Sequence, residues 1–139
     1  MTVVICVVTD SPLDVAAHEA AVNHPAAGAV VSFAGVVRDH DGGRGVSRLE
    51  YESHPSAEAI LSEVAEEIAK DRAVYAVAVS HRIGPLAVGD VALAAAVSTA
   101  HRADAFAACA RLVDEVKARL PIWKHQIFAD GTDEWVNSP

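Results

Sequence analysis

The chain has 139 residues, of which 52% are hydrophobic, and its formal net charge is −8 at pH 7. This length predicts a single domain over residues 1–139 with a modest core, and the apolar content excludes an intrinsically disordered chain. The negative charge argues against binding to nucleic acid or to an anionic membrane, so any cation that binds an anion must act locally.

The N-terminal half of the chain alternates strand and helix signals. A β-branched run at the N-terminus predicts a strand, and the following "DSPLD" predicts a helix that Ser11 caps and that runs to about His24. Residues 28–39 and 46–53 then read as two strands. The glycine-rich "HDGGRG" between them indicates a hairpin loop, so these two strands are expected to pair with each other.

The C-terminal half continues the alternation. Ser56 predicts the cap of a second helix, and residues 73–84 and 90–100 predict two strands joined by "PLAVG". A third helix is expected from about Ala100 until Pro121 ends it. Its expected apolar stripe is Phe106, Cys109, Val113, Val116 and Leu120. A strand at "IWKHQIFAD" and a short one at "GTDEWV" complete an α+β fold, mainly antiparallel, with three helices.

Several familiar chemistries lack their sequence signals. The chain has no glycine-rich nucleotide motif, no HxxxH pair of histidines and no GxSxG nucleophile turn. Cys6 and Cys109 lie apart in apolar runs, which is typical of buried, reduced thiols. Without a signal-peptide pattern or a membrane-length apolar run, the sequence predicts a cytoplasmic protein with no metal site and no cofactor.

The segment "STAHRADAF" places two cations where a helix begins. His101 and Arg102 open the third helix, where backbone N–H groups already favour an anion. Cations in a first turn oppose the helix dipole, so the placement costs stability unless an anion binds there. The pattern therefore favours a phosphate or carboxylate site over a solvated turn. The similar "SHRIG" leads into a tight turn, so His81 and Arg82 read as structural.

Other cations lie near chain features that build sites. Arg38 ends an apolar strand beside the glycine-rich loop, and strand ends next to loops often carry ligands. Lys117 lies in the last turn of the third helix, where a cation also suits the dipole. Lys124 follows the proline, and a lysine held among apolar neighbours can exchange a proton near neutral pH. His125 and Gln126 beside it add polar groups.

Four segments in order resemble a known family. They are "FAGVVRDHDGGRGVSRLEYES", "HRIGPLAVGD", "STAHRADAF" and "KARLPIWKHQ". Together they are similar to the large, catalytic subunit of the molybdopterin synthase family, and the resemblance covers about residues 28–136. It implies an α+β fold with an α/β-hammerhead part. It also implies a sulfurtransferase that inserts sulfur into cyclic pyranopterin monophosphate to form the dithiolene of molybdopterin.

The resemblance also implies partners and residue roles. Sulfur arrives as a thiocarboxylate on the C-terminal Gly-Gly of a small ubiquitin-like subunit, in a heterotetramer built around a dimer of large subunits. Lys117 and Lys124 match the family's two active-site lysines. Arg38 matches the arginine of its VR motif, and His101 and Arg102 match its AHR motif. Metal ions and redox cofactors are not implied.

The length of the third helix bears on the assembly. His101 and Lys117 lie about 15 residues apart, so at about 1.5 Å per residue they are about 22 Å apart on a straight helix. One small pocket cannot use both ends of such a helix. We therefore expect a homodimer in which each site combines the His101–Arg102 end of one chain with the Lys117–Lys124 end of the other.

Some positions depart from the family pattern, and two other functions stay open. Ala57 and Val113 stand where members of the family carry Met, and no arginine follows "WV" before Pro139. A binding module that senses a phosphorylated metabolite would keep the anion site but would not need both lysines. A scaffold for a ubiquitin-like protein would need a groove but no anion site. A measurement of turnover separates these possibilities.

Overall fold

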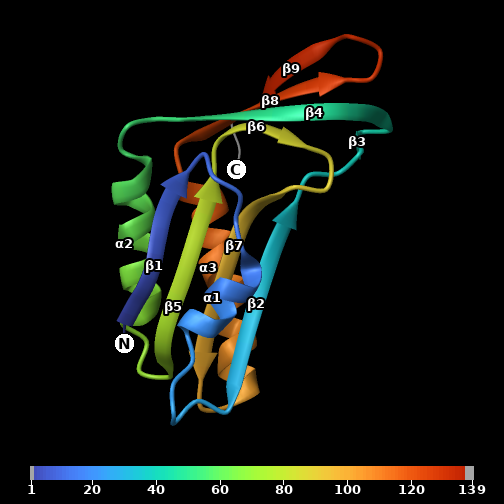
Figure 1. Ribbon diagram of the computed structural model, residues 1–139. Helices are drawn as coiled ribbons and strands as arrows, with labels where there is room; N and C mark the ends of the chain where they lie inside the picture. Colours follow the sequence, from blue (N-terminus) through green and yellow to red (C-terminus); the bar gives the residue numbers. More distant parts are fainter. Residues whose placement is uncertain (1, 137–139) are drawn as a thin grey trace.

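The computed structural model describes residues 2–136, which form two sheets and three helices (Figure 1). The helices are α1 (Val15–Ala21), α2 (Ala57–Ala69) and α3 (Arg102–Arg119). The strands are β1 (Thr2–Thr9), β2 (Ala29–Val36), β3 (His40–Asp41), β4 (Arg44–Ser53), β5 (Val74–Arg82), β6 (Gly84–Ala87), β7 (Val91–Thr99), β8 (Ile122–Phe128) and β9 (Asp133–Val136). This arrangement confirms the predicted α+β class with three helices.

The first sheet has the strand order β1-β5-β7-β2, in which only β1 and β5 run parallel within the described chain. Helices α2 and α3 cover one face, and α1 lies on the other (Figure 1). The central strands β5 and β7 are therefore covered on both sides. This explains why they read as continuous apolar runs and not as an alternation of apolar and polar residues.

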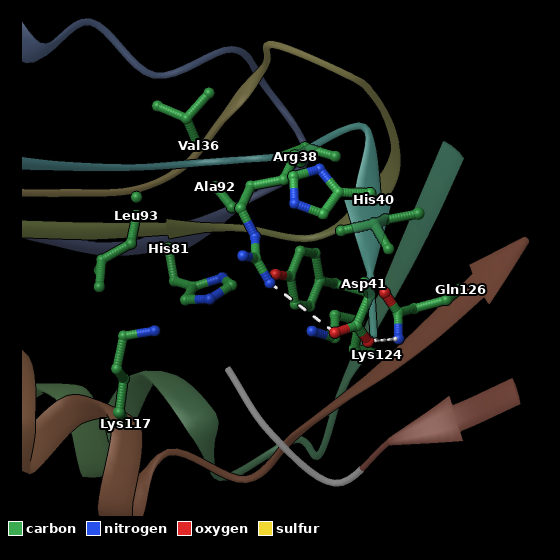
Figure 2. Close-up of a pocket in the computed structure, with 14 residues that line it drawn as sticks. Val36, Arg38, His40, Asp41, His81, Ala92, Leu93, Lys117, Lys124 and Gln126 are labelled. Atoms are coloured by element: carbon green, nitrogen blue, oxygen red, sulfur yellow. Dashed lines mark hydrogen bonds and ion pairs between the residues drawn. The ribbon is translucent and has the colours of Figure 1, made fainter. Parts of the chain in front are cut away.

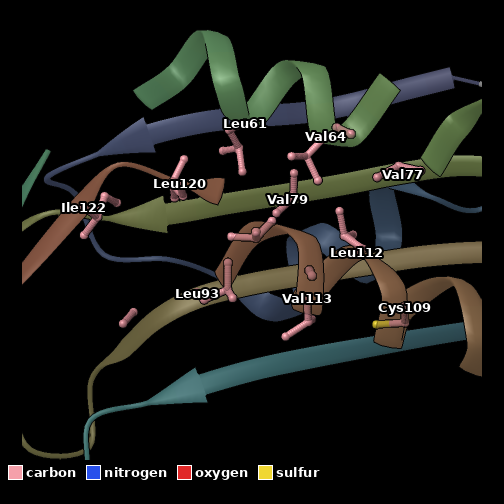
Figure 3. Close-up of a cluster of buried hydrophobic side chains, with 14 of the residues drawn as sticks. Leu61, Val64, Val77, Val79, Leu93, Cys109, Leu112, Val113, Leu120 and Ile122 are labelled. Atoms are coloured by element: carbon pink, nitrogen blue, oxygen red, sulfur yellow. The ribbon is translucent and has the colours of Figure 1, made fainter. Parts of the chain in front are cut away.

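The main core lies between the first sheet and helices α2 and α3 (Figure 3). Leu61 of α2 and Leu112 of α3 are fully buried, and they pack with Val77 and Val79 of β5. Burying a side chain of this size contributes roughly 1.5–3 kcal/mol. This layer holds α3 rigidly on the sheet, and α3 in turn carries Lys117 to one end of it.

The opposite face of the sheet anchors α1 through a buried histidine. Nε2 of His18 accepts a hydrogen bond from Ser80 Oγ at 2.7 Å, while Nδ1 donates to the Asp14 carbonyl at 2.6 Å. Ala78 and Ala96 beside it are small and fully buried. Small side chains let a short helix approach the sheet closely, so this face is structural.

The second sheet lies across one end of the first (Figure 1). Its order is β3-β4-β8-β9, and β6 pairs with β4 on the other side. The chain passes between the sheets after β2, where Val37 donates its N–H to the Asp90 carbonyl and accepts from Gly89. The strand ends of the first sheet therefore face the side chains of the second, and a cavity forms between them.

Two predictions about strands were wrong. The strand at residues 46–53 does not pair with the strand at residues 28–39, because β2 pairs with β7 in the other sheet. The glycine-rich loop forms a hairpin with only the short β3, and Gly42 and Gly43 turn the chain there with φ of 58° and 79°. The segment "PLAVG" contributes β6 and is more than a connection.

Helix boundaries also differ from the prediction. Helix α1 begins at Val15, and its cap is Asp14, whose carboxylate accepts from the Ala17 N–H, so Ser11 does not cap it. Ser56 occupies the cap position of α2 without a capping bond, because its hydroxyl pairs with His54.

The apolar stripe of α3 is partly different from the predicted one. Phe106 is 62% exposed, because it lies toward the edge strand β2 and away from the centre of the sheet. Smaller residues at Ala105 and Ala108 face the sheet with Leu112 instead. The helix ends at Arg119, two residues before Pro121, close to the predicted end.

Both cysteines are free; Cys109 is buried and Cys6 is half-buried. Burial, together with the nearby Glu58 carboxylate, raises the pKa of the Cys6 thiol to about 11. Neither thiol is therefore activated as a nucleophile. Among the described helices, none combines the length and the apolar character that a membrane crossing requires.

Candidate active site

A cavity of about 310 Å³ opens where the two sheets meet (Figure 2). The segment after β2 supplies one wall, β4 and β8 of the second sheet supply another, and β5, β7 and the end of α3 supply the rest. Its polar and charged lining residues are Arg38, His40, Asp41, Tyr51, His81, Lys117, Lys124 and Gln126. The cavity therefore collects side chains from six separate parts of the chain.

Both predicted lysines reach this cavity. Lys117 lies in the last turn of α3, and Lys124 is the third residue of β8. The helix ends at Arg119 and the strand begins at Ile122, so the sharp turn at Pro121 brings the two side chains to one space from two different elements. Lys117 is exposed and Lys124 is half-buried in the chain.

Arg38 is the third cation of the cavity. Its guanidinium lies 3.7 Å from the carboxylate of Asp41 and is 67% exposed, so it is free to turn toward a ligand. Asp41 also accepts a 2.7 Å hydrogen bond from the amide of Gln126. This bond, followed by the charges of Lys124 and Arg38, holds the pKa of Asp41 below its usual range. Asp41 is therefore a carboxylate that orients the cations around it.

Gln126 is almost fully buried, at 2% exposure, in the wall of the cavity. Its amide nitrogen donates to Asp41 and, at 3.0 Å, to Glu134 of β9. The side chain therefore links β8 to β3 and β9. We infer that it positions the carboxylate of Asp41, in addition to any contact with a ligand.

His81 lines the cavity although it reads as structural in the sequence. Its Nδ1 donates to the Arg82 carbonyl at 2.7 Å, and its ring meets that of Tyr51 edge-on at 5.0 Å between centroids. Burial, aided by the positive charge of Lys117, lowers the pKa of His81 to about 4. The imidazole is therefore neutral at pH 7. Burial also raises the pKa of the Tyr51 hydroxyl, which stays protonated.

The state of His81 predicts a pH dependence of stability. The unfolded state binds the proton with a pKa near 6.5 and the folded state with one near 4, so this stability is complete above pH 6.5 and falls as the pH drops toward 4. At pH 5 the free energy of unfolding should be about 2 kcal/mol lower than at pH 8 on this account. Denaturant titrations of the wild type and His81→Gln at both pH values test it. The variant should lose that part of the pH dependence, and equal pH dependence in the two proteins would contradict the assignment.

His101 and Arg102 lie outside this cavity within one chain. His101 is the N-cap residue of α3 and Arg102 its first residue, while Lys117 is in the last turn of the same 18-residue helix. At about 1.5 Å per residue the two ends are about 22 Å apart. The first turn also holds Asp104, a carboxylate that the helix dipole favours. A shared role with the lysines thus requires a second chain, and it stays a prediction.

His125 lies on the opposite face of β8 from Lys124 and Gln126, because successive side chains of a strand point to opposite faces. Its Nε2 is 2.6 Å from the carboxylate of Asp133, and its ring stacks on Trp135 at 4.3 Å between centroids. The geometry of one chain therefore gives His125 a contact within the β8–β9 hairpin and none with the cavity.

Ala57 and Val113, two of the positions that depart from the family pattern, lie away from the cavity. Ala57 is buried in the core at the start of α2. Val113 lines a separate apolar groove of about 410 Å³ between β2 and α3, together with Phe33 and Phe106. The position after "WV", where family members carry an arginine, lies outside the described residues. Neither substituted methionine position therefore changes the wall of the cationic cavity.

Sequence reasoning missed His40, Asp41, Tyr51 and His81 as residues of the site. Each belongs to a segment that is distant in sequence from the lysines, and the strand pairing of β4 with β8 brings Tyr51 opposite Lys124. The sequence "HRIG" was a usable signal for His81, since it places a histidine at the end of a buried strand. Within residues 2–136, histidine, cysteine and acidic side chains form no group of three that could hold a metal ion.

Comparisons with known proteins identify relatives over most of the chain. The family model described as "MoaE protein" matches residues 8–119. A molybdopterin synthase catalytic subunit from Staphylococcus carnosus is 40% identical over 130 residues, which cover 93% of this chain and 86% of that protein. The one from Arabidopsis thaliana is 39% identical over 120 residues, covering 86% of this chain, and the chain spans 61% of its length.

A solved structure has the same fold. The crystal structure of molybdopterin synthase from Staphylococcus aureus matches with a TM-score of 0.85 at 34% sequence identity. The match covers 93% of this chain and 94% of that one.

Proposed function

The chain belongs to the MoaE protein family, and relatives of the chain are molybdopterin synthase catalytic subunits. On that premise we propose the reaction that it catalyses. It transfers sulfur from the thiocarboxylated C-terminus of a small ubiquitin-like subunit to cyclic pyranopterin monophosphate. The product carries the dithiolene of molybdopterin. The observation that carries this proposal is the convergence of Arg38, Lys117 and Lys124 on one cavity from three separate parts of the chain.

The charge of the cavity suits these reactants. The chain has a net charge of −8, yet the cavity holds three cations against one carboxylate, Asp41. Both the phosphate of the pterin and the thiocarboxylate of the partner are anions. A local positive site in an acidic protein attracts them while the rest of the surface does not. By holding the two anions together, the site reduces the entropic cost of bringing the reactants into contact, and this contributes to catalysis.

The reaction assigns a task to each cation. Arg38 binds phosphate or pterin oxygens, for which its planar guanidinium is suited. The thiocarboxylate sulfur forms the new carbon–sulfur bond as a carbon–oxygen bond of the substrate breaks, and one lysine donates a proton to the leaving oxygen. The other lysine stabilises negative charge that develops. Water then cleaves the acyl–sulfur bond and leaves a carboxylate on the partner tail. A second thiocarboxylated partner repeats the transfer, because the dithiolene contains two sulfur atoms.

His101 and Arg102 lie outside the cavity of their own chain, so their role in the reaction depends on the assembly. We place His101 and Arg102 of one chain near the lysines of a second chain in a homodimer, within a heterotetramer that also holds two small subunits. A sensor of a phosphorylated metabolite would not require two lysines in the same cavity as Arg38, so their convergence favours an enzyme. A scaffold would not require the anion site.

A reconstituted turnover assay tests the proposal. The chain is mixed with a thiocarboxylated small partner that ends in Gly-Gly and with cyclic pyranopterin monophosphate, and molybdopterin is then measured. The matched control is the same partner with an ordinary C-terminal carboxylate, which carries no sulfur to transfer. Molybdopterin should appear only with the thiocarboxylate. No product in either reaction, with both proteins folded and associated, would reject the function.

Arg102→Ala should weaken substrate binding about tenfold or more and leave docking of the small subunit nearly unchanged. The reason is the position of Arg102 at a helix N-terminus, where a guanidinium and backbone N–H groups together bind an anion. Calorimetry with the substrate and, separately, with the partner measures both effects. The matched control is Arg111→Ala, which removes an exposed arginine of the same helix that pairs with Asp71. An equal loss for both ligands in Arg102→Ala would point to a scaffold role.

A further inference from the structure

We propose that Nε2 of His81 accepts a hydrogen bond from an N–H group of the heterocycle of the substrate, and so distinguishes a phosphorylated pterin from other phosphates. This inference rests on the proposed function. It concerns a residue that is 1% exposed and that lies on the wall of the cavity beside the cations (Figure 2).

The hydrogen bonding of His81 decides which nitrogen faces the ligand. Nδ1 must carry a proton, because it donates to the carbonyl of Arg82 at 2.7 Å. A neutral imidazole holds only one N–H, so Nε2 carries a lone pair. Among residues 2–136, no donor bonds to this nitrogen, and the edge-on contact with Tyr51 is made by the ring. This nitrogen is on the wall of the cavity, where water or a ligand can donate a hydrogen bond to it.

The other groups of the cavity explain why an acceptor matters there. Arg38, Lys117 and Lys124 are donors only. Asp41 accepts, but Gln126 and Arg38 already engage its carboxylate. A substrate that combined a phosphate with ring N–H groups would satisfy the cations through its phosphate and would still need acceptors for its ring. His81 provides one at a fixed position, because its other nitrogen is held by the backbone.

His81 is better suited to accept a hydrogen bond than to take a proton. A base whose conjugate acid has a pKa of about 4 is too weak to hold a proton at neutral pH, and efficient general bases have pKa values near the working pH. The same low basicity keeps Nε2 an acceptor across the physiological range, even with the titratable His40, Asp41, Tyr51 and the two lysines around it. Its role is therefore recognition of the heterocycle.

The test compares two ligands on the wild type and three variants. His81→Phe keeps the ring volume and removes the acceptor, and it should bind cyclic pyranopterin monophosphate about 10- to 100-fold more weakly than the wild type. Its affinity for inorganic phosphate should be unchanged. His81→Gln, whose amide oxygen can accept, should recover at least part of the affinity. His54→Phe, which replaces an exposed histidine outside the cavity, is the matched control and should bind as the wild type does.

The outcomes separate this inference from the proposed function. Unchanged pterin affinity in a folded His81→Phe protein overturns the inference alone, and so does an equal loss for inorganic phosphate. Failure of the wild type to bind the pterin phosphate overturns the proposed function and the inference with it. If both variants fail to fold, the wild type labelled with ¹⁵N-histidine is titrated instead. The Nε2 resonance of His81 should move with the pterin phosphate and not with phosphate alone; no movement with the pterin overturns the inference.

Discussion

Lys117→Ala and Lys124→Ala are each expected to reduce the rate of molybdopterin formation by at least about a hundredfold. A positioned proton donor typically contributes 10²–10⁴-fold and a charge stabiliser about 10²–10³-fold. The two ammonium groups reach one cavity from α3 and β8, so neither can replace the other without a change of backbone. Single-turnover rates at saturating substrate measure the effect on the chemical step.

The fold should survive both substitutions. Lys117 is exposed and Lys124 half-buried, and neither is part of the apolar core between the sheet and its helices. The matched control is Lys70→Ala, which removes an exposed lysine at the end of α2, away from the cavity. Circular dichroism and thermal unfolding verify the folded state. Nearly full activity in both folded lysine variants would remove the lysines from the mechanism.

Subunit exchange between two inactive variants is expected to restore about a quarter of wild-type activity. One variant is His101→Ala/Arg102→Ala, and the other is Lys117→Ala/Lys124→Ala. Helix α3 is continuous from Arg102 to Arg119, so its two ends cannot face one small cavity in a single chain. A two-fold dimer resolves this if each site combines the N-terminal end of one α3 with the lysines of the other chain.

The fraction of activity that exchange restores follows from how the two variants combine. Each mixed dimer holds one site that carries both sets of substitutions and one site that is intact. Random exchange of equal amounts gives about half mixed dimers, and thus about a quarter of the sites are intact. Mass tags on the two variants verify the exchange, and each variant exchanged with itself is the control. Verified mixed dimers without activity would place each site within one chain and would contradict the argument from the length of α3.

Local patterns in the sequence were sufficient for much of the fold. The β-branched and alanine-rich runs predicted β5 and β7, and Pro121 marked the end of α3. These signals depend on neighbours within a few residues, so they do not require the tertiary structure. The pairing of β2 could not be read in this way, because an apolar strand beside a glycine turn is compatible with either of two sheets.

The sequence by itself determined which cationic side chains are candidates for binding an anion. The tertiary structure decided which of them lie in one cavity. Arg38, Lys117 and Lys124 stood out by their places at element ends, and all three line the cavity. His125 stood beside Lys124 in the sequence, yet strand alternation turns it to the other face of β8. His81 looked structural, yet the packing of β5 against the second sheet leaves its imidazole on the cavity wall. Side chains from distant segments converge through strand register and helix packing, which depend on contacts across the whole chain, so no local pattern specifies them.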